Sequence, residues 1–310
     1  MTKSEFISRD HSLRIGVVAV QNDSWEKILE RCLLCEELGF DSIWYPDHFL
    51  HWNKTMMPFF ELWTTLSALA SQTSRIRLGT LVTAMHWRNP AWLAKQALTV
   101  DHISKGRLEL GLGAGGSSKI EYSMTGVEEW EPSEKVKRFR EYVEIVDQLL
   151  RNPVTTYHGK YYHLEETVMQ PDSIQKPRPP LTLGAHRPRM LQIAAQYADT
   201  WNTLGDPISN EESMESVKQR IKLLETYSKK INRNNQKIRL SFLVYERDVV
   251  HNFAKSKLYE STEIFKETVE KCLDLGFTEI LVPYPLIEEE IPIFKKIAQE
   301  VIPEIRNSYS

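Results

Sequence analysis

Cysteine, long apolar runs and net charge are all scarce in this sequence of 310 residues. The three cysteines, Cys32, Cys35 and Cys272, cannot all pair, so we expect no disulfide framework and a reducing compartment. No stretch approaches the roughly 18 consecutive apolar residues of a membrane-spanning helix. The net charge is -3 and no run of lysine or arginine exceeds two, which argues against a nucleic-acid surface. We therefore expect a cytoplasmic protein that binds neither nucleic acid nor membrane.

Apolar, β-rich runs alternate with helical patterns along the whole chain, which is typical of a parallel sheet covered by helices. Eight such runs predict strands at 13–20, 41–47, 76–83, 107–113, 180–185, 200–203, 238–246 and 278–284. Eight helices are predicted near 24–38, 59–72, 90–104, 133–151, 188–198, 210–232, 262–275 and 288–300. This alternation predicts an α/β fold, a (β/α)8 TIM barrel forming a single domain over residues 1–310.

Local signals refine the ends of these helices, and one segment departs from the alternation. Ser24 and Ser133 suit helix N-caps, whereas Gly39 and Gly276 suit the left-handed residue that follows a helix. Residues 152–180 instead combine a short hairpin with a proline-stiffened linker. We interpret them as an insertion between the fourth helix and the fifth strand.

In a (β/α)8 barrel the chemistry lies at the carboxyl ends of the strands. The second predicted strand ends in "WYPDHFLHW", residues 44–52, which brings Asp47 and His48 to that edge among aromatic side chains. An imidazole exchanges protons near neutral pH, and flat aromatic surroundings suit a ring-shaped ligand. A structural histidine at the start of a loop is the alternative interpretation.

A metal site formed by Asp47, His48 and His51 would support a different class of function, a metal-dependent TIM-barrel hydrolase. Against it, His86 and His186 have no neighbouring acid, so the ligand count is poor. We therefore predict no metal.

The glycines of "LGLGAGGSSKIEY", residues 110–122, formally satisfy a dinucleotide-binding fingerprint. The next regular helix is predicted only near Ser133, so a Rossmann turn is rejected. Bare main chain from Gly113 to Ser118 can still hold a phosphate, and "LGAHRP" at 183–188 is a second glycine-bearing strand end before a helix. Tight turns that require glycine are the alternative.

Three segments together resemble the bacterial luciferase-like superfamily of flavin- and F420-dependent oxidoreductases. They are "ELGFDSIWYPDHF", "RIRLGTLVT…NPAWLAKQALTVDHISKGRLELGLGAG" and "PPLTLGAHRPRMLQIAAQYADTWNT", and they occur in the family's order. The resemblance extends from about residue 13 to 285 and implies a (β/α)8 barrel. The aromatic-Asp-His-Phe pattern is more typical of the branch that uses F420, a 5-deazaflavin, with FMN as the alternative cofactor.

The resemblance also implies roles for individual residues. His48, with Asp47 beside it, would face the reactive ring and handle a proton, and the Leu81–Val82 peptide would form a cis bulge behind that ring. The implied cofactor contacts are Asp47, Leu81, Val82, Thr83, Gly113, Ala114, Gly115, Gly116, Gly184, Ala185 and His186. Trp52, Glu121, Tyr122 and Trp201 would line the substrate pocket.

One position departs from the family's glucose-6-phosphate dehydrogenases, which carry a glutamate where this chain has Gly116. A sugar-phosphate substrate is therefore doubtful. The sequence predicts an F420-dependent oxidoreductase that acts on an unidentified small molecule, with an FMN-dependent monooxygenase as the nearest alternative and a non-enzymatic flavin binder as another. A homodimer through the second and third barrel helices is a further expectation from the resemblance.

Overall fold

The computed structural model describes residues 12–52, 56–116, 119–233 and 237–309. The chain divides into two compact units, each built from separate stretches of sequence. One comprises residues 1–20, 30–44 and 185–310, and the other comprises residues 21–29 and 45–184. The single domain expected over residues 1–310 stays a prediction.

All eight predicted strands are present, and their order confirms the (β/α)8 barrel. They are β1 (Arg14–Val18), β2 (Ser42–Tyr45), β3 (Arg77–Thr80), β5 (Leu108–Gly113), β8 (Leu181–Gly184), β9 (Thr200–Gly205), β10 (Arg239–Val244) and β11 (Glu279–Pro283). The hydrogen-bonded order is β3-β2-β1-β11-β10-β9-β8-β5, and β3 also pairs with β5, which closes the ring. A two-residue strand, β4 (Thr83–Ala84), continues the third predicted strand beside β5.

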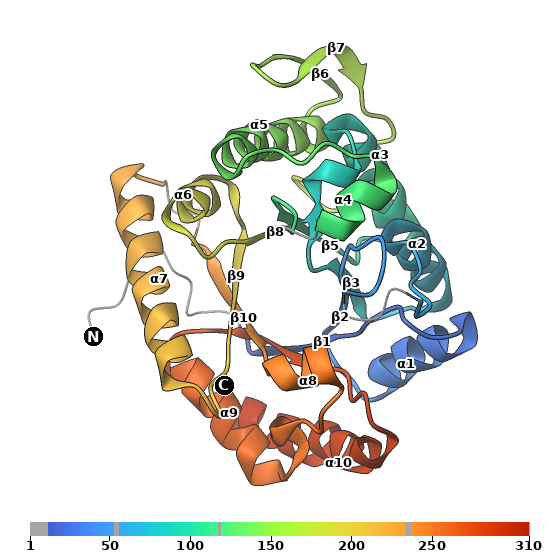
Figure 1. Cartoon of the computed structure of the whole chain (residues 1–310), viewed down its shortest axis with the longest axis vertical. Coiled ribbons are helices and arrows are strands. Elements are labelled where there is room, and N and C mark those ends of the chain that lie inside the picture. The colour runs from blue at the N-terminus through green and yellow to red at the C-terminus, as the bar shows by residue number, and fades with distance from the viewer. Residues whose placement is uncertain (1–11, 53–55, 117–118, 234–236, 310) are drawn as a thin grey trace. The chain divides into compact units, whose positions relative to one another are not determined.

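In the unit that contains the C-terminus, β1, β9, β10 and β11 are parallel neighbours. Helices α6 (Pro188–Tyr197) and α7 (Glu211–Lys230) pack against each other, and α7 also contacts β9 (Figure 1). The remaining helices are α8 (Arg247–Asn252), α9 (Thr262–Asp274), α10 (Ile291–Lys296) and α11 (Ile302–Ser308). The helix predicted at 288–300 is present as one uninterrupted helical stretch from Glu288 to Ser308, in which 3-10, α, π and α turns follow one another.

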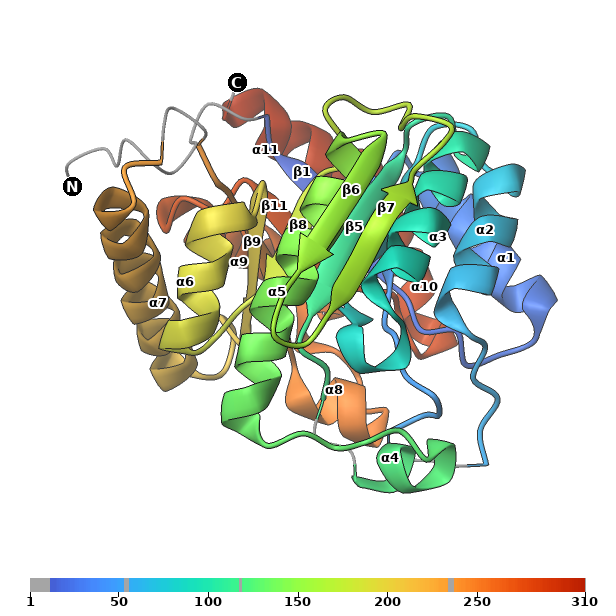
Figure 2. The same cartoon turned by 90° about the horizontal axis from the view of Figure 1, so that it is seen from above.

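In the other unit, β5 pairs in parallel with β3, β4 and β8. Helices α2 (Leu62–Gln72), α3 (Pro90–Ile103) and α5 (Pro132–Arg151) follow one another around it, with α3 packed against both of the others (Figure 1). Figure 2 shows the antiparallel hairpin of β6 (Val154–His158) and β7 (His163–Val168) as a separate ribbon beside α5. The hairpin expected within residues 152–180 is thus confirmed.

The predicted helix signals are confirmed at three of four positions. The Ser24 hydroxyl accepts a hydrogen bond from the Lys27 amide at the start of α1 (Trp25–Glu37). Gly39 and Gly276 have φ values of +81° and +90°. Ser133 was wrongly predicted as an N-cap, because α5 begins at Pro132 with Glu131 as the capping residue. Proline fits the first helical position, where its missing N–H costs nothing.

The structure also contains helices that the sequence pattern did not predict. The short α4 (Lys119–Thr125) and α8 span too few residues to show a full apolar repeat. All three cysteines are buried, and none of them forms a disulfide. Within the part of the chain that the structure describes, no helix has the length and apolar character needed to cross a bilayer.

Gly111 on β5 lies against Thr80, the last residue of β3. A Cβ atom at Gly111 would stand 1.8 Å from the Thr80 carbonyl oxygen and 3.3 Å from Val82 Cγ1. The Thr80 hydroxyl also bonds both the Gly111 carbonyl, at 2.8 Å, and the Gly111 amide, at 2.9 Å. Only glycine permits this approach, so β5 fixes the position of the segment that follows β3.

We expect Gly111→Ala to destabilise the protein by about 1–3 kcal/mol, because the added methyl group meets main chain that cannot move aside cheaply. Urea unfolding monitored by circular dichroism would measure the change. Gly116→Ala is the matched control, since its Cβ position has no contact within 4 Å from the described residues beyond its chain neighbours. Equal stability of the two variants would contradict this account of Gly111.

Candidate active site

The candidate site lies where β2, β3 and β5 end, within the unit of residues 21–29 and 45–184. The Leu81 amide donates to the Tyr45 carbonyl at 2.8 Å, which joins the segment after β3 to the end of β2. Carboxyl ends of parallel strands share one edge of a sheet. Asp47 with His48, the 81–84 segment and the glycines from Gly113 onward are therefore neighbours, as the sequence predicted.

Asp47 is buried and both of its carboxylate oxygens are engaged. Its Oδ2 accepts from the Ala84 amide at 2.9 Å and from Arg88 Nη1 at 2.5 Å, while Arg88 Nη2 lies 3.2 Å from Oδ1. Arg88 also donates to Glu61 at 2.5 Å. Burial alone would lower the pKa of Arg88, but the charges of Asp47 and Glu61 raise it. This geometry gives Asp47 the task of holding the 81–84 segment in place.

The peptide bond between Leu81 and Val82 is cis, as the resemblance implied. Val82 packs against the glycines of the neighbouring strands. A Cβ atom at Gly113 would stand 2.4 Å from Val82 Cγ2, and one at Gly184 would stand 3.5 Å from Val82 Cγ1. The next hydroxyl, Thr83 Oγ1, is buried and has no hydrogen-bond partner among the described residues. Gly113 is thus needed first for packing against the bulge.

Beyond β5 the glycines differ from one another. Gly115 has a φ of +85°, and a Cβ there would lie 2.1 Å from His86 Nδ1, so His86 packs directly on its main chain. Gly116 is exposed, and a Cβ atom there would meet nothing within 4 Å among the described residues outside its chain neighbours. Ala114 is half-buried. Ser117 and Ser118, which the sequence also suggested for phosphate, lie outside the described residues. Gly116 is therefore the position with the most accessible main chain.

Tyr122 of α4 and Lys135 of α5 both contact the main chain at Gly116. Lys135 Nζ lies 3.2 Å from the Gly116 carbonyl oxygen and 3.1 Å from the Tyr122 hydroxyl, which also donates to Gly116 at 3.2 Å. The His86 ring contacts both Trp87 and Tyr122, at 4.1 and 4.8 Å between centroids. Burial, reinforced by the charge of Lys135, lowers the pKa of His86 to about 4. His86 is therefore neutral at physiological pH.

His48 contacts Glu121 of α4 through one ring nitrogen. Nδ1 lies 3.2 Å from Oε1 and 3.3 Å from Oε2, and the Phe49 amide donates to Oε1 at 2.8 Å. The side chain of His48 is 32% exposed while that of Glu121 is 6% exposed. Glu121, which was predicted to line a substrate pocket, is thus joined directly to the proposed proton carrier.

The aromatic residues predicted around His48 are present. Trp52 meets the His48 ring edge-on at 5.5 Å between centroids and stacks on His51 at 4.5 Å. His51 is buried in this stack, and Asp47 is bonded to Arg88. Across the residues that the structure describes, no three His, Cys, Asp or Glu side chains are arranged to hold a metal ion. The geometry therefore gives the Asp47, His48 and His51 metal hypothesis no support.

Trp201 was wrongly placed in the substrate pocket. It is completely buried in β9, its indole N–H donates to the Ala185 carbonyl at 2.8 Å, and its ring stacks on Phe277. A side chain this enclosed cannot meet a ligand without rearrangement of the core. The spacing of the strand pattern did not reveal which face of β9 each residue occupies.

His186 lies beside an arginine that the sequence reading did not single out. Its Nδ1 is 3.2 Å from Thr203 Oγ1, and Arg220 of α7 donates to the same oxygen at 2.9 Å and to the Leu204 carbonyl at 3.2 Å. Burial lowers the pKa of Arg220, and burial together with Arg220 lowers the pKa of His186 to about 4. His186 is therefore neutral at physiological pH, and Arg220 is the member of this pair that would attract an anion.

Four functional candidates escaped the sequence reading: Arg88, His86, Lys135 and Arg220. Arg88 lies 41 residues from its partner Asp47 in the sequence, and Lys135 lies 19 and 13 residues from its partners Gly116 and Tyr122, so no local motif joins them. Only His86 could have been found from the sequence, because it lies three residues after the predicted third strand, 76–83, and so near the edge where the chemistry is expected.

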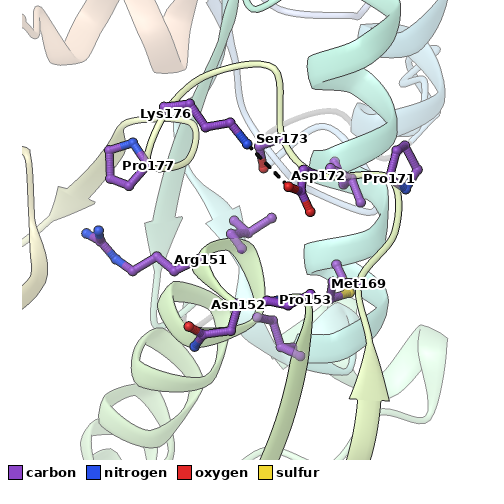
Figure 3. Close-up of a pocket in the computed structure, with 12 residues that line it drawn as sticks. Arg151, Asn152, Pro153, Met169, Pro171, Asp172, Ser173, Lys176 and Pro177 are labelled. Carbon is purple, nitrogen blue, oxygen red and sulfur yellow. Dashed lines mark ion pairs between the residues drawn. The ribbon is translucent and has the colours of Figure 1, made fainter.

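A separate cavity of about 60 Å³ lies at the C-terminal end of α5. Residues of α3, α5 and the 169–177 segment line it, and Lys176 pairs with Asp172 at 3.6 Å across its mouth (Figure 3). Small-molecule sites usually exceed roughly 300 Å³, so this cavity has room for a few water molecules only. It contains none of the predicted site residues.

Comparison with known proteins decides the family. The sequence profile of the luciferase-like monooxygenases matches residues 7–242. This chain belongs to that family. The resemblance predicted from the strand ends is confirmed.

Relatives in this family include both F420-dependent and flavin-dependent oxidoreductases. The chain is 32% identical over 189 residues to 5,10-methylenetetrahydromethanopterin reductase of Archaeoglobus fulgidus, covering 60% of this chain and 52% of that one. It is 29% identical to an F420-dependent glucose-6-phosphate dehydrogenase of Amycolatopsis mediterranei, with 71% and 66% covered. It is 28% identical to the oxygenase component of a flavin-dependent trigonelline monooxygenase of Acinetobacter baylyi, with 60% and 50% covered. The matches thus span about half to two thirds of these relatives.

Solved structures share the fold across nearly the whole chain. An F420-dependent secondary alcohol dehydrogenase in complex with an F420-acetone adduct superimposes with a TM-score of 0.75 at 19% identity, covering 94% of this chain and 100% of that one. The F420-dependent tetrahydromethanopterin reductase of Methanopyrus kandleri gives 0.75 at 20% identity, with 95% and 99% covered. These likenesses establish the TIM-barrel fold.

The lowered pKa of His86 makes the stability of the protein depend on pH. The folded state holds this histidine neutral down to about pH 4, whereas the unfolded chain takes up a proton near 6.5, so acid favours unfolding. We expect the wild type to lose about 1–3 kcal/mol more than His86→Phe as the pH falls from 6.5 to 4. Urea unfolding at several pH values would measure this. His158→Phe, at an exposed hairpin histidine, is the matched control, and parallel curves for wild type and His86→Phe would contradict the assignment.

Proposed function

We propose that this protein is an F420-dependent oxidoreductase that transfers a hydride between C5 of the deazaflavin and an organic substrate, with His48 handling the proton. The observation that supports it most is the placement of His48, partly exposed beside the 81–84 segment and held through Nδ1 by Glu121. Its other ring nitrogen is thereby left for a substrate. Both F420-dependent and flavin-dependent relatives are similar to this chain in sequence.

The described residues fit a planar ring with an anionic tail. Leu81 and Val82 are half-buried and apolar, which suits the back face of such a ring, and the neighbouring Thr83 hydroxyl has no partner among the described residues. Gly116 offers open main chain next to the Lys135 ammonium group. We propose Leu81, Val82, Thr83 and Gly113–Gly116 as cofactor contacts, with Gly184, Ala185 and His186 added from the resemblance.

When bound, the deazaflavin would accept or supply the hydride at its C5 carbon. The protein's own residues do the rest. His48 Nε2 takes the proton of a substrate hydroxyl as the hydride leaves the adjacent carbon, or returns it in the reverse direction. Trp52 and Tyr122 would exclude water beside the reacting atoms, and Asp47 acts indirectly by holding Ala84.

An FMN-dependent monooxygenase is the second candidate, because one relative is the oxygenase component of a flavin-dependent monooxygenase. A glucose-6-phosphate substrate remains disfavoured despite the similarity to such dehydrogenases, since Gly116 stands where they carry a glutamate. We propose a small-molecule substrate and a cytoplasmic location.

We also propose a homodimer formed through α2 and α3. Trp92 of α3 is 71% exposed and borders a shallow groove of about 340 Å³ between these helices. In that groove Trp63 Nε1 and Gln96 Oε1 are buried without a partner among the described residues. A second copy of the chain would cover the exposed tryptophan.

Reconstitution tests the cofactor. The purified protein is titrated with F420 and with FMN, and fluorescence quenching gives the two dissociation constants. We expect tighter F420 binding and turnover that proceeds without oxygen. His48→Ala is expected to reduce kcat by roughly 100-fold or more with little change in F420 affinity. Tight FMN binding with oxygen-dependent turnover would favour the monooxygenase, and an unchanged kcat would remove His48 from the mechanism.

Sedimentation velocity tests the assembly. We expect wild type to sediment as a dimer and Trp92→Asp as a monomer, because a carboxylate would be buried at the interface. Val154→Asp changes an apolar hairpin residue that is 51% exposed and serves as the matched control. A monomeric wild type, or a dimeric Trp92→Asp variant, would contradict the proposed interface.

A further inference from the structure

We propose that Glu121 is a positioning residue that fixes the tautomer and the orientation of the His48 ring. This role rests on the proposed function for its catalytic meaning, but the tautomer itself can be measured without any cofactor. Sequence reasoning and the resemblance assigned Glu121 only to the wall of a substrate pocket. The contacts of its carboxylate lead to a more specific task.

Contacts other than the one with His48 hold the carboxylate of Glu121 in place. The Phe49 amide donates to Oε1 at 2.8 Å, and the residue is 4% exposed. The next residue, Tyr122, bonds the Gly116 carbonyl and receives a hydrogen bond from Lys135. Main chain on one side and the anchored α4 helix on the other therefore leave Glu121 little freedom, which is what a positioning group requires.

The chemistry of the contact determines the tautomer. Burial alone would raise the pKa of Glu121, but the hydrogen bond from His48 and the amides of Phe49 and Leu50 lower it, so Glu121 remains ionised. An ionised carboxylate can only accept hydrogen bonds. Nδ1 of His48, at 3.2 and 3.3 Å from its two oxygens, must then carry the proton. The neutral ring consequently presents Nε2 as an acceptor.

The orientation of the ring is fixed from its other sides by aromatic contacts. Trp52 and Phe59 both meet His48 edge-on, with centroids at 5.5 and 6.4 Å. Rotation of the imidazole about its Cβ–Cγ bond would move Nδ1 away from Glu121 and change the contacts with both aromatic rings. Glu121 thus controls which nitrogen reaches the substrate, while the rings limit how far the imidazole can turn.

Glu121→Gln separates this role from simple packing. The glutamine has nearly the same shape, and its oxygen can still accept from the Phe49 amide. Its NH₂ group would then face Nδ1 and donate to it, which favours the opposite tautomer, with the proton on Nε2. Glu129→Gln is the matched control, because Glu129 is an exposed glutamate a few residues further along the same chain segment.

The decisive measurement is the pair of ¹⁵N shifts of the His48 ring in the cofactor-free protein, recorded in an alkaline buffer. Loss of the signal in His48→Gln identifies it. We expect wild type and Glu129→Gln to carry the proton on Nδ1, and Glu121→Gln to carry it on Nε2. A wild-type ring protonated on Nε2, or a tautomer unchanged in Glu121→Gln, would overturn the proposal. The wild-type spectrum decides the first point even if the variant does not fold.

Steady-state kinetics with the reconstituted protein then connect the tautomer to turnover. We expect Glu121→Gln to lower kcat by roughly tenfold or more while F420 affinity, measured by fluorescence, stays within about twofold. An altered tautomer with unchanged kcat would refute the catalytic importance of Glu121. If no substrate turns over with either cofactor, the proposed function fails, whereas the tautomer result stands on its own.

Discussion

The close approach of the 81–84 segment to β5 is the constraint on which the candidate site depends. Gly111 and Gly113 have no side chains, so Thr80 and Val82 come directly against the strand. Asp47, backed by Arg88, bonds the Ala84 amide and holds the far end of the same segment. Because the next residues lead to His86, the position of that ring over Gly115 also follows from this packing.

The neighbouring residues Asp47 and His48 make polar interactions of different kinds. Asp47 points to buried Arg88 and serves the main chain, whereas His48 remains partly exposed and meets Glu121. A buried carboxylate paired in this way is unsuited to proton exchange, because changing its charge would leave the guanidinium unpaired. The imidazole has no such restriction. Adjacent positions in the sequence therefore have different duties, one supporting the site and one available to a ligand.

Much of this arrangement could be predicted from the sequence. The eight strands were evident because apolar runs alternate with amphipathic helices, and the cis bulge followed from the family resemblance. Arg88, Lys135 and Arg220 were missed because each meets its partner through the fold, not through a local motif. Trp201 was misplaced for a related reason: a buried strand carries large side chains on both faces, so its sequence does not reveal which of them reach the ligand.

The three cysteines have a practical consequence for anyone who studies this protein. Cys32, Cys35 and Cys272 are all enclosed, and burial raises the pKa of Cys35 and of Cys272 so that their thiols resist ionisation. Maleimide reagents attack the thiolate of an accessible sulfur. A cysteine introduced on the exposed surface would accordingly be labelled selectively with a fluorophore or a spin probe, without prior removal of the native thiols.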